Sequence, residues 1–186
     1  MVLALTLHCR HHKLTMRRIV YLTAMVYMKT AAVKNYDVWW MNVQQQHQLT
    51  FKLTACNDAS ILLSQMQSAE GSDGHEIRLG THSNTRSSFY LDKTGTGHAI
   101  EVDTPNILKC TEPGAYWISF GDGIISIGTG PQIGINAFLG YNYSTLNIRF
   151  LAFATDNGAT GNWMVSQSGD SGEIFKFSKM VSTRTK

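Results

Sequence analysis

Four carboxylates are the first residues of this chain whose chemistry could go beyond packing: Asp58, Glu76, Asp122 and Asp156. Paired carboxylates can exchange protons with a substrate, and larger groups of them can bind Ca²⁺. Their spacing lacks the regular DxDxDG pattern of a calcium-binding loop. Asp58, Asp122 and Asp156 are instead expected to organise turns through hydrogen bonds to their own backbone. We therefore predict no metal site and assign no catalytic residue.

Other arrangements that could support catalysis are equally weak. His75 and Glu76 are sequence neighbours, and neighbours in a strand point to opposite faces, which prevents a dyad. Glu76 and Arg78 share one face of a strand, and we expect a surface ion pair worth under ~1 kcal/mol. No GxSxG motif, the turn that presents a nucleophilic serine, is present in the sequence.

The glycine-rich segment 125–134 superficially resembles a phosphate-binding loop after a strand. Such a loop works because a helix begins there and points its N–H groups at the ligand. Here Pro131 and Gly134 precede a short, aromatic-rich loop, and no acidic residue closes a βαβ unit. We predict a hairpin or strand-exit loop, and no bound cofactor.

Apolar residues alternate with polar ones in short runs, which is typical of β-strands. Leu49, Phe51 and Leu53 illustrate the pattern, and Gly121-Asp122-Gly123 is a strong hairpin signal. No helical period runs for ten residues after residue 34. The sequence predicts an all-β, jelly-roll-like sandwich of two antiparallel sheets with about ten short strands. We expect them at 49–55, 61–63, 76–79, 88–91, 100–102, 116–120, 124–127, 148–154, 163–165 and 174–177.

Charge is unevenly distributed along the 186 residues. Residues 1–34 contain six basic residues and no acid, whereas the remainder contains ten basic and thirteen acidic residues. The folding part therefore lacks the positive charge that nucleic-acid binding requires. Nucleic acid is not an expected partner.

Residues 1–34 differ in character from the rest. Arg17-Arg18, an apolar stretch over 19–28 and the small residues Ala31-Ala32 are ordered as in a secretory leader, if Met16 is the effective start. The alternative is a disordered N-terminus. The apolar stretch is too short for a transmembrane segment. We predict a leader at 1–34, one domain at 35–186, and secretion.

Two further features bear on the compartment. Cys56 and Cys110 are an even pair in the domain, which suits one disulfide, although two buried free thiols are the alternative. A bridge closing a loop of this length would contribute about 4 kcal/mol. Asn142-Tyr143-Ser144 is an acceptor sequence for N-glycosylation at Asn142.

Four blocks of sequence, in order, resemble the farnesoic acid O-methyltransferase-like domain family. They are 51–64, 76–87, 116–128 and 150–163. Thr81-His82-Ser83 stands where the family has a glycine-tryptophan pair before the asparagine, here Asn84. The segment Lys109-Cys110-Thr111 is similar to forms of the domain with a second cysteine, which implies a Cys56–Cys110 bridge.

The family name implies methyl transfer from S-adenosylmethionine to farnesoic acid, an isoprenoid acid. The residues offer no acidic group to hold a ribose and no identifiable general base. The resemblance therefore supports the fold more than the activity. Members also occur as modules of secreted invertebrate proteins, which suits a recognition role.

We therefore expect a non-catalytic recognition module that binds a glycan or another ligand through its loops. Trp39, Trp40, Tyr141 and Tyr143 could stack on sugar rings, whereas Trp117 and Trp163 are expected in the core. Hydrogen bonds to hydroxyl groups are expected from Asn84, Arg86, Asn157 and Asn162. The alternatives are the methyltransferase and a protein–protein assembly module.

Overall fold

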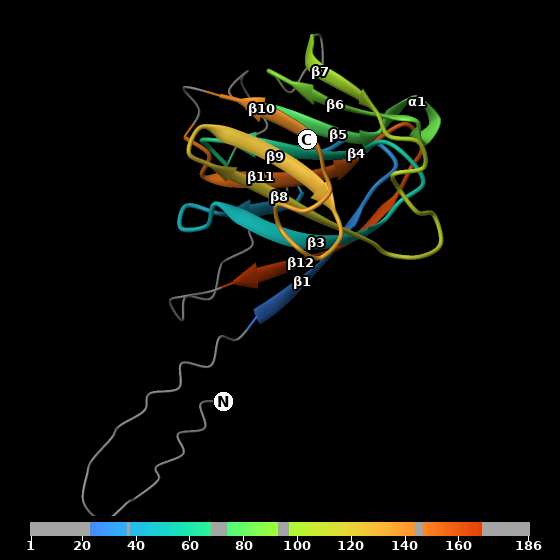
Figure 1. Cartoon of the computed structure of the whole chain (residues 1–186). Coiled ribbons are helices and arrows are strands. Elements are labelled where there is room, and N and C mark those ends of the chain that lie inside the picture. Colours follow the sequence, from blue (N-terminus) through green and yellow to red (C-terminus); the bar gives the residue numbers. More distant parts are fainter. Residues whose placement is uncertain (1–22, 37, 68–73, 93–96, 144–146, 169–186) are drawn as a thin grey trace, which may run out of the picture.

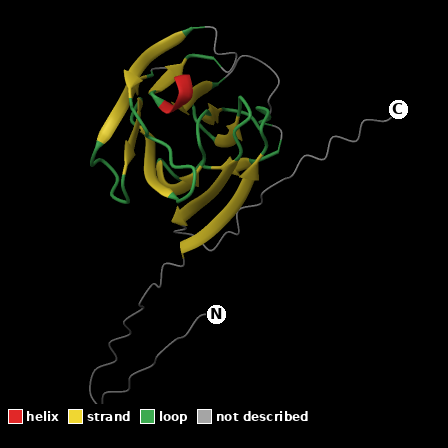
Figure 2. Ribbon diagram, turned by 90° about the vertical axis from the view of Figure 1, so that its right-hand side faces the viewer, coloured by secondary structure: helices red, strands yellow, loops and turns green. Residues whose placement is uncertain are grey.

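A computed structural model of the chain describes residues 23–36, 38–67, 74–92, 97–143 and 147–168. Twelve strands form two six-stranded antiparallel sheets that pack face to face (Figures 1 and 2). The predicted all-β sandwich is confirmed. The one helical turn of the described residues, α1 (Thr81–Asn84), has four residues, far short of what a membrane-crossing helix requires. The predicted strand at 174–177 lies outside the described residues.

The chain changes sheet between some consecutive strands, whereas other consecutive strands follow each other within one sheet. Sheet A has the order β1 (Thr23–Thr30), β12 (Gly161–Ser168), β3 (Gln48–Thr54), β8 (Gly114–Gly121), β9 (Ile124–Thr129) and β10 (Ala137–Asn142). Sheet B has the order β2 (Trp40–Asn42), β11 (Phe150–Thr155), β4 (Ala59–Ser64), β5 (His75–Gly80), β6 (Arg86–Tyr90) and β7 (His98–Asp103). Strands β4 to β7 thus follow each other within sheet B and β8 to β10 within sheet A, whereas connections such as β3–β4 and β11–β12 cross from one sheet to the other.

Aromatic side chains join the two sheets in the core. Phe51 of β3 stacks on Tyr116 of β8, with ring centroids 5.3 Å apart. Trp163 of β12 meets Phe153 of the opposite sheet edge-on at 5.2 Å. Trp117 and Trp163 are each only 1% exposed, as predicted for core tryptophans. Burying each large side chain contributes roughly 1.5–3 kcal/mol, so this contact stabilises the pairing of the sheets.

The ordered sheet begins earlier than the sequence analysis expected, because β1 lies within the segment 1–34. Val26 and Met28 face inward while Tyr27, 67% exposed, faces outward. Thr30 is buried, and its hydroxyl accepts a hydrogen bond from Nε1 of Trp163 at 3.1 Å. The apolar stretch at 23–28 is thus part of an edge strand of sheet A. A leader before residue 23 lies outside the described residues and stays a prediction.

The glycine-rich segment is a strand-exit loop, as predicted. The loop between β9 and β10 covers Trp117, whose Nε1 donates to the carbonyl oxygen of Ile135 at 2.7 Å. A Cβ atom on Gly128 would lie 2.4 Å from Cζ2 of Trp117. Glycine is therefore needed at 128 for packing against this indole. Strand β10, which follows this loop, was not expected.

Glu76 is the one charged side chain among the fully buried described residues, at 0% exposed. Arg78 donates to it at 2.7 Å, Lys34 donates at 3.1 Å, and the Tyr36 hydroxyl also donates. Burial and the adjacent carboxylate raise the pKa of Tyr36 well above its ordinary value. The predicted ion pair of Glu76 and Arg78 is present. The prediction that it lies on the surface is wrong, because the carboxylate is fully buried. Residues 31–36 cross this face of sheet B and cover the carboxylate.

Candidate functional site

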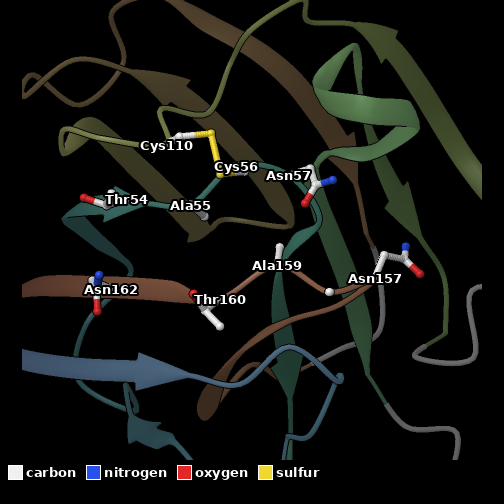
Figure 3. Close-up of a pocket in the computed structure, with 10 residues that line it drawn as sticks. Thr54, Ala55, Cys56, Asn57, Cys110, Asn157, Ala159, Thr160 and Asn162 are labelled. Carbon is white, nitrogen blue, oxygen red and sulfur yellow. A yellow bond between two sulfur atoms is a disulfide. The ribbon is translucent and has the colours of Figure 1, made fainter.

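A pocket of about 340 Å³ opens at one end of the sandwich, where three segments meet. They are the connection after β3, the chain before β8 and the connection from β11 to β12. Figure 3 shows a disulfide on one side and Ala159, Thr160 and Asn162 on the other. The pocket is lined by Thr54, Ala55, Cys56, Asn57, Cys110, Asn157, Gly158, Ala159, Thr160 and Asn162.

A disulfide between Cys56 and Cys110 forms one wall, which confirms the predicted pairing. It joins two connections that cross between the sheets, 54 residues apart in sequence, with a Cα–Cα distance of 4.3 Å. The backbone N–H of Ala55 also donates to the carbonyl oxygen of Lys109 at 3.0 Å. Both cysteines are exposed on the surface. The bridge therefore fixes the shape of this wall.

The opposite wall is the tight turn Asp156-Asn157-Gly158. Asn157 (φ 51°) and Gly158 (φ 83°) both adopt left-handed backbone, which these two residue types tolerate best. Asp58, at φ 49°, accepts the N–H of Asp156 through its carbonyl oxygen at 3.0 Å. Asp58 and Asp156 lie in these turns, but the Asp156 carboxylate accepts the N–H of the distant Lys34 at 3.3 Å and not a backbone group of its own turn. Burial raises the pKa of Asp58, an effect that a hydrogen bond from Asn157 opposes.

The chemistry of the pocket is neutral and polar. Asn57, Asn157 and Asn162 contribute amides, and Thr54 and Thr160 contribute hydroxyls. The alanines and the disulfide sulfurs supply small apolar surface, and none of the ten lining residues is charged. Each amide can both donate and accept hydrogen bonds. The arrangement suits an uncharged ligand rich in hydroxyl or amide groups.

The structure places only two of the predicted ligand residues, Asn157 and Asn162, at this pocket. Asn84 is committed elsewhere, because its side-chain amide donates to the carbonyl and accepts from the N–H of Leu108, each at 3.0 Å. Arg86 lies on the outer face of sheet B and pairs with Glu101 at 2.6 Å. Their roles in binding stay predictions.

Tyr141 and Tyr143 lie at the opposite end of the sandwich. Tyr141 stacks on Phe89 with centroids 4.6 Å apart, and the Tyr143 hydroxyl donates to the carbonyl of Phe120 at 3.0 Å. Asn142 between them is exposed. Trp40 is 2% exposed and packs with Leu62, so its expected stacking on a sugar is wrong.

Sequence reasoning missed Thr54, Asn57 and Thr160 as lining residues. Thr54 and Asn57 flank Cys56, so the predicted disulfide was the signal that could have identified them. Thr160 stands two residues before Asn162, in a turn that was recognised. Their proximity depends on β3 and β12 being neighbours in sheet A, which no local pattern specifies.

No group of three or more histidine, cysteine, aspartate or glutamate side chains within the described ranges is placed to hold a metal ion. The acidic side chains that do cluster in the described ranges form ion pairs with basic side chains. Arg86 also approaches Asp103 at 3.4 Å, and Nδ1 of His82 lies 4.0 Å from Glu101. These groups lie on sheet B and away from the pocket.

A family model described as farnesoic acid O-methyl transferase matches residues 22–168. No curated protein matches the chain. Among solved structures, the fold is similar to galectin LEC-6 of Caenorhabditis elegans, with 11% identity, 79% of this chain and 93% of that chain covered, and a TM-score of 0.42.

Two other solved structures are similar at the same level. A variant of human galectin-16 has 7% identity, 80% and 99% coverage of the two chains, and a TM-score of 0.45. The exoplasmic domain of VIP36, in a form bound to Ca²⁺ and Man3GlcNAc, has 8% identity, 83% and 85% coverage, and a TM-score of 0.44.

Proposed function

The chain belongs to the farnesoic acid O-methyltransferase family, and from this premise we propose that it is a non-catalytic recognition module that binds a neutral carbohydrate. The observation that carries the proposal is the lining of the disulfide-walled pocket, which consists of amides, hydroxyls and small apolar surface without a charge. Sugars present hydroxyl groups that both donate and accept hydrogen bonds. Asparagine and threonine side chains match that pattern.

The size and the fixed walls of the pocket suit a small ligand. Its volume of about 340 Å³ is at the lower end of the range of roughly 300–1,000 Å³ that ligand pockets occupy. That space suits one sugar ring or the end of a chain. The disulfide fixes one wall and the left-handed turn at Asn157 the other, so little ordering is needed on binding.

The family name favours a second function, methyl transfer, and the pocket does not fit it. S-adenosylmethionine carries a sulfonium and an ammonium group, which need carboxylates or other electron-rich partners nearby. None of the lining residues is acidic, and none is a general base of suitable strength. We derive no methyl-transfer step through this site.

Secretion and glycosylation are part of the same proposal. An exposed disulfide is typical of proteins that fold in an oxidising compartment, which supports an extracellular location. Asn142 is exposed at the end of β10 and accessible to a glycan. Expression in a secreting eukaryotic cell should release the chain into the medium. Asn142→Gln should remove a mass shift sensitive to N-glycosidase; an unshifted original chain would contradict glycosylation.

Calorimetric titration of the full chain tests the binding proposal. The titrants are neutral mono- and oligosaccharides, with S-adenosylmethionine and farnesoic acid in parallel. We expect saturable binding of a neutral sugar, weakened about tenfold or more by Asn57→Ala or Asn162→Ala, since each removes paired hydrogen bonds. The matched control is Asn147→Ala, an exposed asparagine outside the pocket.

Two outcomes contradict the proposal. One is the absence of saturable heat from any neutral sugar while the chain is folded. The other is sugar binding that neither pocket variant weakens. Saturable one-to-one binding of S-adenosylmethionine would instead restore the methyltransferase function on this fold.

A further inference from the structure

The two sheets have four edge strands, and β1 differs from the other three. Strand β2 has only three residues, and the pairings of β7 and β10 each contain a register shift. Strand β1 has eight residues and pairs with β12 at every position without a shift. Short length and irregularity are the usual protections of an edge against pairing with another chain. Strand β1 has neither.

The free side of β1 is defined by the hydrogen bond from Nε1 of Trp39 to the carbonyl oxygen of Lys29 at 2.9 Å. Because backbone groups alternate between the two sides of a strand, those of Met25 and Tyr27 point the same way as those of Lys29. Trp39 therefore caps the edge at Lys29. The stretch 23–28 has no partner strand on that side within the described part of the chain.

The side chains next to this free edge are apolar. Tyr27 is 67% exposed and Met25 is 39% exposed, both on the outer face of sheet A. They are two of the seven large hydrophobic side chains described as exposed. Residues 23–28 include no charged side chain. In Figure 1, β1 forms the border of the sandwich.

We propose that β1 pairs antiparallel with β1 of a second copy of this chain. A twofold axis perpendicular to the sheet would bring the two stretches 23–28 together, so that both sheets A continue as one. Because residues 23–28 carry no charge, pairing the stretch with its copy would bring no like charges together. Lys29 lies outside it, at the end of β1 that Trp39 caps. It would remove Met25 and Tyr27 from water in both copies.

This inference does not depend on the ligand, but it bears on where the pockets would lie. Asn162 of the pocket is the register partner of Lys29, one strand in from the edge. Because the pocket lies at the C-terminal end of β1 and the two β1 strands would run antiparallel, a dimer would carry its two pockets at opposite ends.

Sedimentation velocity of the full chain over a concentration series tests the proposal. We expect a species of twice the chain mass of 20.7 kDa that dissociates on dilution. Tyr27→Pro removes a backbone donor on the free side without removing a bond to β12, and should weaken the dimer about tenfold or more. Tyr27→Lys, which keeps the donor and adds like charges across the twofold axis, should also weaken it.

The matched control is Ala99→Pro on the edge strand β7, at the register shift where Ala99 has no strand partner. It should leave the dimer intact, and circular dichroism should show that each variant is folded. A monomer at every concentration overturns the proposal. A dimer that both Tyr27 variants leave unchanged, or that Ala99→Pro dissociates, also overturns it.

Discussion

Replacement of Glu76 by glutamine should lower the free energy of unfolding by about 3 kcal/mol. The carboxylate is 0% exposed, and Arg78 and Lys34 contact it at 2.7 and 3.1 Å. Breaking a buried ion pair costs roughly 3–5 kcal/mol because the remaining charge is left without a partner. Both cationic side chains are 21% exposed, so water screens them in part and the lower end of this range applies.

The matched control is Glu101→Gln on the same face of sheet B. Glu101 also pairs with an arginine, Arg86, at 2.6 Å, but the two side chains are 17% and 46% exposed. Its loss should therefore cost under about 1 kcal/mol. Urea unfolding followed by circular dichroism measures both changes. Equal losses for the two variants, or a loss under about 1 kcal/mol for Glu76→Gln, would refute the reasoning from burial.

Three other perturbations have clear expectations. Replacing Cys56 and Cys110 together by alanine should cost about 4 kcal/mol in urea unfolding, because the bridge closes a 54-residue separation; a much smaller cost would show a compact unfolded chain. Gly128→Ala should cost more than about 2 kcal/mol, since its Cβ would meet an indole at 2.4 Å, whereas Gly97→Ala has open space and should be neutral. Burial lowers the pKa of His75 in the folded chain below the ordinary 6.5. As the pH falls below 6.5, the unfolded chain therefore binds a proton at His75 before the folded chain does, and the free energy of unfolding should decrease. His75→Gln should flatten that pH dependence, and an unchanged slope would contradict it.

The parts of the fold that could be predicted are those in which local pattern and tertiary environment agree. Leu49, Phe51 and Leu53 alternate with polar residues and all face the core. Asp122-Gly123 supplies the two left-handed residues of the β8–β9 hairpin, with φ values of 54° and 75°. Both signals depend only on residues that are close in sequence, so they can be read from the sequence alone.

The N-terminal strand shows why another part was missed. In β1 the outward positions carry Met25 and Tyr27, so the strand lacks a polar face and its sequence reads as a continuous apolar run. The basic residues before it completed the pattern of a leader. An apolar outer face at a sheet edge cannot be distinguished from a buried segment by composition.

The candidate site shows the remaining limit. Of the predicted ligand residues, Asn157 and Asn162 line the pocket, whereas the side chain of Asn84 clamps Leu108 and that of Arg86 pairs with Glu101. Sequence indicates which side chains can hydrogen-bond. It does not indicate whether the fold has already used them, because those partners are distant in the chain.

The register of β1 and β12 also determines how the domain responds to mechanical force. Thr23 is the partner of Ser168, so the described chain enters and leaves the sandwich at one point. A pull applied through both of these ends acts across the strand pair, and separates its hydrogen bonds one after another from Thr23–Ser168 towards Thr30–Gly161. Shear, in which all the bonds resist together, would need a pull along the strands in opposite directions. Tension along the polypeptide would therefore peel β1 from β12 before it disturbs the core.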